Sequence, residues 1–273
     1  MHQLLTFAFL AGLALPGLAQ HAHAPTTNAG AWTDLPIIQA QADRQDRSRA
    51  QLRLSGLDAA EITVYPPAGP ARTLPLHGGK AELTVGAQGN YHWLLARAES
   101  PEEIRVASSV RYFGNPGPAP TAMLAQPKSE LEIVPQPLPR EHWQYRSAEA
   151  WDFLIRFQGQ PLADATLHFM SKNGSHAAFR SDAAGRVRLA FPNDWPADAM
   201  TEDGHRRPMT PFVLMVEHEA AGRRYLSAFN HVYGPDPMQA RSLAAGAGCL
   251  ALGGVLALPL LRRRKEKKEG KSC

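Results

Sequence analysis

Short stretches in which apolar and polar residues alternate recur along the chain from residue 51 onward. They cover residues 51–55, 61–65, 81–85 and 91–97, and a further stretch at 105–113 closes the series. Successive side chains of a strand point to opposite faces, so this period of two predicts strands with one buried face. Proline- and glycine-rich turns separate the stretches at about ten-residue intervals, which is the spacing of a small β-sandwich.

A second series of the same kind follows residue 129. In its clearest stretch, 150–157, one face collects the large apolar side chains Trp151, Phe153, Ile155 and Phe157. Asn173-Gly174 and residues 181–185 are turn signals, and the stretches at 212–218 and 224–229 are predicted to form a hairpin. A second β-sandwich is therefore predicted here.

These two series define the expected fold class. We predict a mainly β protein with two immunoglobulin-like or transthyretin-like β-sandwich domains, residues 31–113 and 129–235. Residues 114–128 contain four prolines and little periodicity. They are predicted to form a Pro-rich linker, or an ordered crossover between the two domains.

The first 24 residues have the order of a secretory signal. An apolar stretch from Leu4 to Leu15 is followed by Pro16-Gly17 and by small residues that fit cleavage after Ala19 or after Ala24. The positive charge before the apolar stretch is weak, because only the terminal amine and His2 can carry it. Residues 1–24 are therefore expected to direct export.

Residues 242–261 form a 20-residue segment without a charged side chain. At about 1.5 Å per residue, a helix of this length crosses a hydrocarbon core of roughly 30 Å. Arg262-Arg263-Arg264-Lys265 follows at once and would hold residues 262–273 in the cytoplasm. A buried helix of a soluble protein is the alternative. We predict a single-pass protein of the bacterial inner membrane, with most of the chain in the periplasm.

The net charge of +4 is concentrated in this tail. Residues 262–273 contain seven Lys and Arg against two Glu, a net of +5, so the rest of the chain sums to −1. A nucleic-acid surface requires a basic face on the folded domain. Nucleic acid is therefore not expected as a partner, whereas a membrane is.

Motifs for covalent or metal-assisted catalysis are missing from the sequence. The only cysteines are Cys249 in the predicted span and Cys273 at the end, so the exported region has no disulfide, thiolate ligand or thiol nucleophile. There is no Gly-x-Ser-x-Gly elbow and no phosphate loop. His218-Glu219 resembles the start of a zinc-protease motif, but Gly222 stands where its second histidine would be. We expect a protein that is not an enzyme.

Three segments resemble a bacterial periplasmic family of unknown function, the one numbered 4198. They are Leu131-Glu-Ile-Val-Pro, then Phe157-Gln-Gly-Gln-Pro-Leu-Ala-Asp-Ala, then Ser181-Asp-Ala-Ala-Gly-Arg-Val-Arg-Leu-Ala-Phe-Pro. The resemblance covers mainly residues 129–234. Some members are described as periplasmic components of cobalt or nickel uptake systems, so the resemblance implies a β-rich periplasmic domain and a role in transition-metal uptake.

The metal-transport members of that family often expose histidine near the mature N-terminus. Here the comparable feature is His21-Ala-His23, and an extended chain places residues i and i+2 on one side. Two imidazoles could then share a Ni, Co, Cu or Zn ion, the one type of cofactor expected. Two ligands bind weakly, and cleavage after Ala24 would remove both. The alternative is a polar, hydrated N-terminus without a metal.

The remaining candidates favour structural roles. His92, His168 and His218 lie in predicted strands, where alternation predicts surface or half-buried positions. Residues 141–146 form an aromatic and polar segment that packs between the domains or lines a ligand groove.

The expected function is a membrane-anchored periplasmic accessory or binding protein that assists transition-metal uptake. A scaffolding protein without a ligand is the alternative. A transporter or another envelope protein is the expected partner.

Overall fold

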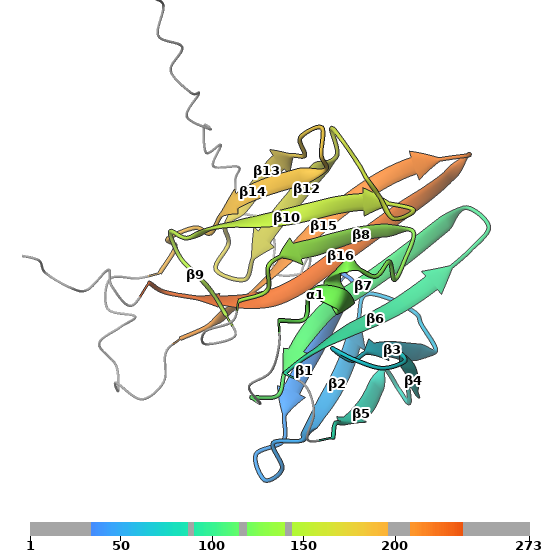
Figure 1. The fold of residues 1–273 in the computed structure, drawn as a ribbon, viewed down its shortest axis with the longest axis vertical. Coiled ribbons are helices and arrows are strands. Elements are labelled where there is room, and N and C mark those ends of the chain that lie inside the picture. The colour runs from blue at the N-terminus through green and yellow to red at the C-terminus, as the bar shows by residue number, and fades with distance from the viewer. Residues whose placement is uncertain (1–33, 87–89, 115–118, 140–143, 196–207, 237–273) are drawn as a thin grey trace, which may run out of the picture.

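Strands dominate the part of the chain that the computed structural model describes, residues 34–86, 90–114, 119–139, 144–195 and 208–236 (Figure 1). The first seven are β1 (Ile37–Ala42), β2 (Arg49–Ser55), β3 (Glu61–Tyr65), β4 (Arg72–Pro75), β5 (Lys80–Thr84), β6 (Tyr91–Glu99) and β7 (Glu103–Tyr112). After the short helix α1 (Thr121–Ala125) come β8 (Leu131–Gln136), β9 (Tyr145–Arg146), β10 (Ala150–Phe157), β11 (Gln160–Pro161), β12 (Thr166–Ser171), β13 (His176–Arg180), β14 (Arg186–Ala190), β15 (Thr210–Ala220) and β16 (Arg223–Gly234). The predicted mainly β class is confirmed.

The described strands form three sheets. A small sheet has the order β1-β2-β5, and a second has the order β11-β10-β14, with β8 also paired to β10. The largest sheet has the order β13-β12-β15-β16-β7-β6-β3-β4, with the short β9 paired to β16. The small sheets cover different parts of the large one, so the architecture is that of two sandwiches.

The large sheet joins strands from both sides of the predicted domain boundary. Strands β7 and β16 run side by side and parallel, with Glu103 opposite Arg224 at one end and Ser109 opposite Asn230 at the other (Figure 1). The Ser109 hydroxyl also donates a hydrogen bond of 2.8 Å to the Asn230 carbonyl oxygen. The two sandwiches therefore share backbone hydrogen bonds as well as side-chain contacts.

Each sandwich has its own hydrophobic core, and β6 contributes to both. Leu94 and Ala96 face the core beneath the β1-β2-β5 sheet, whereas Trp93 and Leu95 face the core beneath the β8 and β10 strands. A strand buried on both faces has an almost continuous run of buried residues, as the first six residues of β6 do.

This position of β6 corrects one prediction. His92, expected at the surface or half-buried, has 4% of its surface exposed, and its ring meets Phe113 edge-on with centroids 5.3 Å apart. His168 is exposed and His218 is half-buried, as expected. The alternation rule failed at His92 because it assumes that one face of the strand meets water, whereas both faces of β6 are covered.

Aromatic rings fill the second core around Tyr145. The Tyr145 ring stacks on Phe191 with centroids 4.8 Å apart and meets Trp151 edge-on at 5.1 Å and Phe212 at 5.4 Å. Such ring pairs are favourable beyond the apolar area that they bury. They hold the short β9 against β16.

Residues 119–128 of the predicted linker form an ordered crossover. It contains α1, whose Met123 side chain is buried in the second core. The Lys128 ammonium nitrogen lies 4.9 Å from the centroid of the Trp93 ring, and burial lowers the pKa of Lys128 to about 8. The crossover is thus packed onto the sandwiches through an apolar and a cation–π contact.

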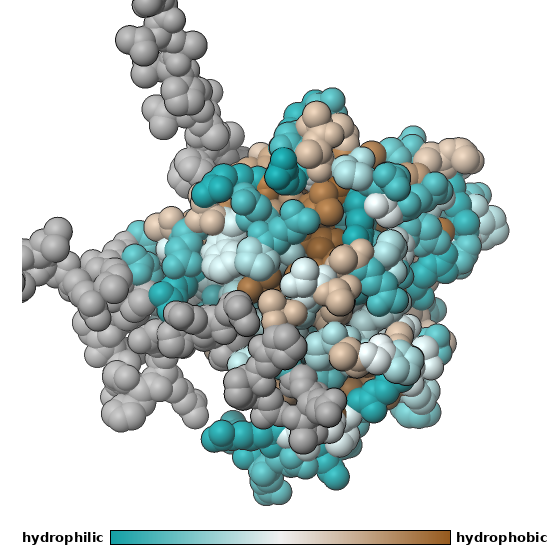
Figure 2. Space-filling view, in the orientation of Figure 1, coloured by the Kyte–Doolittle hydropathy of each residue, from teal (hydrophilic) through white to brown (hydrophobic). Residues whose placement is uncertain are grey.

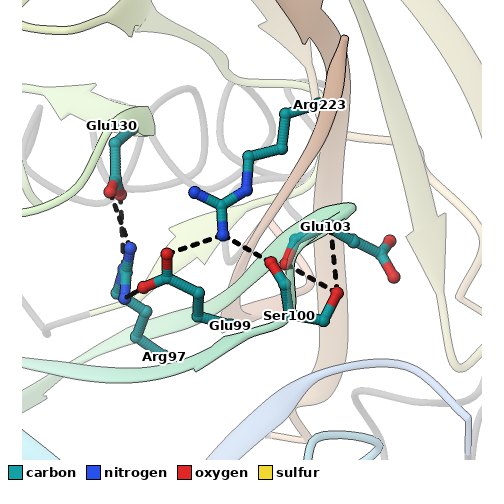
Figure 3. A network of polar contacts seen from close by, with 6 residues as sticks. All are labelled: Arg97, Glu99, Ser100, Glu103, Glu130 and Arg223. Atoms are coloured by element: carbon teal, nitrogen blue, oxygen red, sulfur yellow. Dashed lines mark hydrogen bonds and ion pairs between the residues drawn. The ribbon is translucent and has the colours of Figure 1, made fainter.

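A charged network joins the two sandwiches where β7 and β16 begin (Figure 3). Arg97 lies 2.7 Å from a Glu130 oxygen and 2.5 Å from a Glu99 oxygen, and Arg223 reaches the other Glu99 oxygen at 2.6 Å. Hydrogen bonds from Arg97 and then from Arg223 lower the pKa of Glu99. Because these side chains are partly exposed, the network adds little to the free energy of unfolding. Its main effect is to orient the two sandwiches relative to each other.

The surface seen in the orientation of Figure 1 is mostly hydrophilic, and Figure 2 shows a small hydrophobic area over β8 and β10. A groove beside α1 contains apolar side chains of both strands and of the helix, including Leu124, Val134 and Leu154.

In the described ranges of the chain, there is no helix with the length and apolar character needed to cross a membrane. The predicted signal, residues 1–24, the predicted span, residues 242–261, and the tail, residues 262–273, lie outside those ranges.

Candidate functional site

A cavity of about 210 Å³ lies where β1 passes the middle of the large sheet. We call it the seam pocket. Its walls are residues 37–40 of β1, 109–112 of β7, 211–212 of β15 and 230–232 of β16. The pocket therefore belongs to both sandwiches and forms only when β1, β7 and β16 are together.

Asn230 fixes one wall of the seam pocket. Its Oδ1 accepts a hydrogen bond from the Ile38 N–H, and its Nδ2 donates one to the Ile38 carbonyl oxygen, both at 3.0 Å. The amide side chain thus takes the place of a neighbouring strand at the edge of β1. Because a buried backbone group without a partner is costly, this double contact specifies where β1 lies.

Arg111 supplies the only cationic side chain among the described lining residues. Its guanidinium carbon lies 5.6 Å from the centroid of the Phe113 ring, and burial lowers its pKa. The Nε atom is buried without a hydrogen-bond partner, and Arg111 makes no ion pair with any described residue. The lining residues also include no carboxylate. A desolvated guanidinium with a free donor is suited to an anionic group.

His231 also lines the seam pocket, and its imidazole is uncharged at neutral pH. Burial lowers its pKa to about 4, and its Nδ1 accepts a hydrogen bond of 2.7 Å from the Val232 N–H. The ring packs beside both Phe212 and Phe229, with a centroid distance of 6.4 Å to each. At neutral pH the positive charge of the pocket is therefore that of Arg111.

The sequence did not indicate this pocket. Arg111 and Asn230 lie far apart in the chain, and the one local signal is the polar pair Ser108-Ser109 within the buried stretch of β7. The residues predicted to bind metal, His21 and His23, lie outside the described ranges, as do residues 141–143 of the aromatic segment. In the described ranges, no three His, Cys, Asp or Glu side chains are grouped as metal ligands would be.

A second polar cluster surrounds Asp194. Its carboxylate accepts hydrogen bonds from the Tyr233 hydroxyl at 2.5 and 2.6 Å, from Ser175 Oγ at 2.7 Å and from Ser171 Oγ at 3.1 Å. The carboxylate thus joins hydroxyl groups of β12, of the turn after β12 and of β16. The cluster is explained by its role in anchoring the chain after β14 to β12 and β16.

Comparisons with known proteins assign the chain to no family. No known family and no curated protein matches the sequence. Among solved structures, a two-domain fibronectin type III segment of chicken tenascin is similar at 10% identity and a TM-score of 0.21, over 71% of this chain and 95% of that one. The FN1–FN3 domains of chicken CNTN1 are similar at 9% identity and a TM-score of 0.20, over 72% of this chain and 63% of that one. These scores are too low to define the fold. The architecture is therefore described by the strand pairing and the two cores alone.

Proposed function

We propose that this protein is an exported, membrane-tethered binding protein without catalytic activity, and that its seam pocket receives an anionic group of its ligand. The observation that carries the proposal is Arg111, a partly buried guanidinium that lines the pocket without a counter-ion among the described residues. The signal-like residues 1–24 and the uncharged residues 242–261 support export and anchoring.

The size and lining of the pocket determine the kind of ligand. About 210 Å³ holds a carboxylate or phosphate-sized group, or the anionic end of a larger molecule that extends outward. The other polar groups of the lining, such as the Ser109 hydroxyl and the neutral His231, bring no charge that would compete with Arg111. A planar guanidinium binds a carboxylate or phosphate through two parallel hydrogen bonds.

A role beside a transition-metal transporter is the setting that the resemblance implies. In this proposal the transporter or another envelope protein is the partner, and His21 and His23 add an N-terminal metal contact if the signal is cleaved after Ala19. This part of the proposal is separate from the seam pocket. Mass spectrometry of the mature N-terminus tests it, because a chain that starts at Pro25 has lost both histidines.

Ligand binding is tested on the full chain in detergent by thermal unfolding with acetate, succinate, citrate and phosphate. A bound anion is expected to raise Tm, by about 5–10 °C at 100 times its Kd. Arg111→Gln should abolish the shift and leave Tm without ligand unchanged or higher, because a desolvated charge is removed. Arg188→Gln, an exposed arginine on β14, is the control and should keep the shift. Equal shifts in the wild type and Arg111→Gln would refute the pocket.

Anchoring is tested by fractionation. The wild-type chain should stay with membranes in carbonate, and a reporter fused after Cys273 should be active in the cytoplasm. Release into the soluble fraction would overturn the tether, independently of the result on the pocket.

A further inference from the structure

Two methionine–histidine pairs lie next to each other on strands β12, β13 and β15. In the strand register, Met170 of β12 is opposite His176 of β13, and His168 of β12 is opposite Met215 of β15. Residues directly opposite in antiparallel strands have Cβ atoms about 4.5–5.5 Å apart. His168 and Met170 are two residues apart on one strand, so the two pairs adjoin.

All four side chains point away from the second core. Their chain neighbours Leu167, Phe169, Leu214 and Val216 are buried in that core, and successive strand residues alternate between faces. Ala177, the neighbour of His176, packs against the same core. His168 is exposed, and Met170, His176 and Met215 are half-buried, so they form a surface cluster that a solvated ion can reach.

Two further contacts define the border of this cluster. The Met215 side chain, like that of Leu35, packs against a small apolar group formed by Ile37, Val213 and Ala228. Glu217, two residues further along β15, is on the same face, and it lines one surface groove together with His168. An anionic side chain therefore lies beside the thioethers and imidazoles.

We propose that His168, Met170, His176 and Met215 form a binding site for a soft monovalent cation, Cu(I). Thioether sulfur is a soft ligand that selects Cu(I), imidazole suits copper as well, and two of each match the low coordination numbers of a d¹⁰ ion. Ni²⁺, Co²⁺ and Zn²⁺ bind thioethers poorly, and the cluster offers them only two imidazoles. Long, unbranched methionine side chains can close on the ion without backbone movement. The site lies on β12, β13 and β15 and goes beyond the function proposed for the seam pocket.

Ag(I), an air-stable analogue of Cu(I), and Cu(I) under anaerobic conditions are the probes. Because Cys249, Cys273, His21 and His23 would also bind them, the reference protein is the full chain with Cys249→Ser, Cys273→Ser, His21→Ala and His23→Ala. This reference is expected to bind one equivalent, and X-ray absorption should report both sulfur and nitrogen ligands. Zn²⁺ should bind at least about tenfold more weakly than Cu(I), a difference of 1.4 kcal/mol or more.

Leucine is the matched replacement, because a Met-to-Leu exchange conserves volume and costs little stability. Met170→Leu with Met215→Leu should weaken Ag(I) binding at least about tenfold and remove the sulfur signal. His168→Gln, at an exposed position, should weaken it without a change in Tm. Met209→Leu, at an exposed methionine ahead of β15, is the control and should bind as the reference does. Unchanged affinity in the double leucine variant, or in His168→Gln, would overturn the site and leave the seam pocket untouched.

Discussion

Arg156 on β10 and Glu132 on β8 lie opposite each other in their sheet and form an ion pair, with 2.6 Å between Nε and Oε2. Only 6% and 3% of their side-chain surfaces are exposed. The Arg156 guanidinium also donates hydrogen bonds of 2.9 and 2.7 Å to the carbonyl oxygens of Ala125 and Gln126, which end helix α1 and follow it. The pair therefore ties the crossover between the sandwiches to the β8–β10 sheet.

Removing one member of this pair is expected to destabilise the protein strongly. Glu132→Gln leaves a buried guanidinium without its counter-ion, and such a change costs about 3 kcal/mol or more of the free energy of unfolding. Asp152→Asn, on the neighbouring strand β10, is the control. The Asp152–Arg188 pair is 3.5 Å long and exposed, so its loss should cost less than about 1 kcal/mol. Urea unfolding measures both. A Glu132→Gln variant as stable as Asp152→Asn would contradict the structural role of the pair.

Asn230 gives a second prediction, because its side chain is the only described hydrogen-bond partner of the outer edge of β1 at Ile38. Asn230→Leu leaves the Ile38 N–H and carbonyl oxygen without partners, which should cost about 2 kcal/mol or more. Hydrogen exchange should show faster exchange of the Ile38 amide. Asn173→Ala removes one exposed hydrogen bond of 3.2 Å to Asp194 and should leave that amide unchanged. Protection of Ile38 that survives Asn230→Leu would mean that β1 is held by other contacts.

Local features of the fold could be predicted from the sequence. The hairpin of β15 and β16 is present, with Ala221-Gly222 at its turn, and the alternation in 150–157 corresponds to β10. These elements are determined by residues close together in the sequence, and hydrophobic periodicity and turn residues are patterns of such residues.

The arrangement of the sheets could not be predicted, and the seam pocket depends on it. The parallel pairing of β7 with β16 joins segments that are distant in sequence, and neither strand has a residue type that specifies a parallel partner. Arg111 and Asn230 can be recognised as parts of one site only when that pairing brings both into the lining of the same cavity. A strand register, likewise, is needed before Met170 and His176 can be recognised as neighbours.

The turn at residues 182–185 allows a test of what glycine does there. Asp182 Oδ1 accepts hydrogen bonds from the N–H groups of Ala184 and Arg186, as the turn signal predicts, and Gly185 has φ of +71°. A Cβ at Gly185 would lie 2.5 Å from the Ile155 carbonyl oxygen.

Gly185→Ala should therefore cost more than Gly174→Ala. Gly174 also has a positive φ, +95°, but a Cβ there meets nothing within 4 Å, so its cost is backbone strain of about 1–2 kcal/mol alone. The clash at Gly185 adds about 1–3 kcal/mol. Thermal or urea unfolding of the two variants measures the difference. Equal losses would show that the sheet around Ile155 yields to the added methyl group.

Two buried histidines make stability depend on pH. Burial and then the charge of Arg72 lower the pKa of His92 to about 4, and burial lowers the pKa of His231 to about 4, whereas an unfolded histidine titrates near 6.5. Between these values the unfolded chain binds more protons than the folded one, so stability rises with pH in this window. It should be constant, as far as these groups go, above pH 6.5 and fall as the pH drops from 6.5 to 4.

Replacing His92 should flatten this dependence. The loss of stability between pH 7 and pH 5 is expected to shrink by about 2 kcal/mol in His92→Phe. At pH 5 the wild-type His92 takes up a proton when the chain unfolds, which favours unfolding, and phenylalanine cannot do so. The comparison uses the difference between the two pH values, so a constant packing cost of the larger ring cancels. His77→Gln, in an exposed turn, should keep the wild-type difference. Urea unfolding at both pH values measures it, and a His92→Phe variant with the wild-type difference would show that His92 is protonated inside the fold at pH 5.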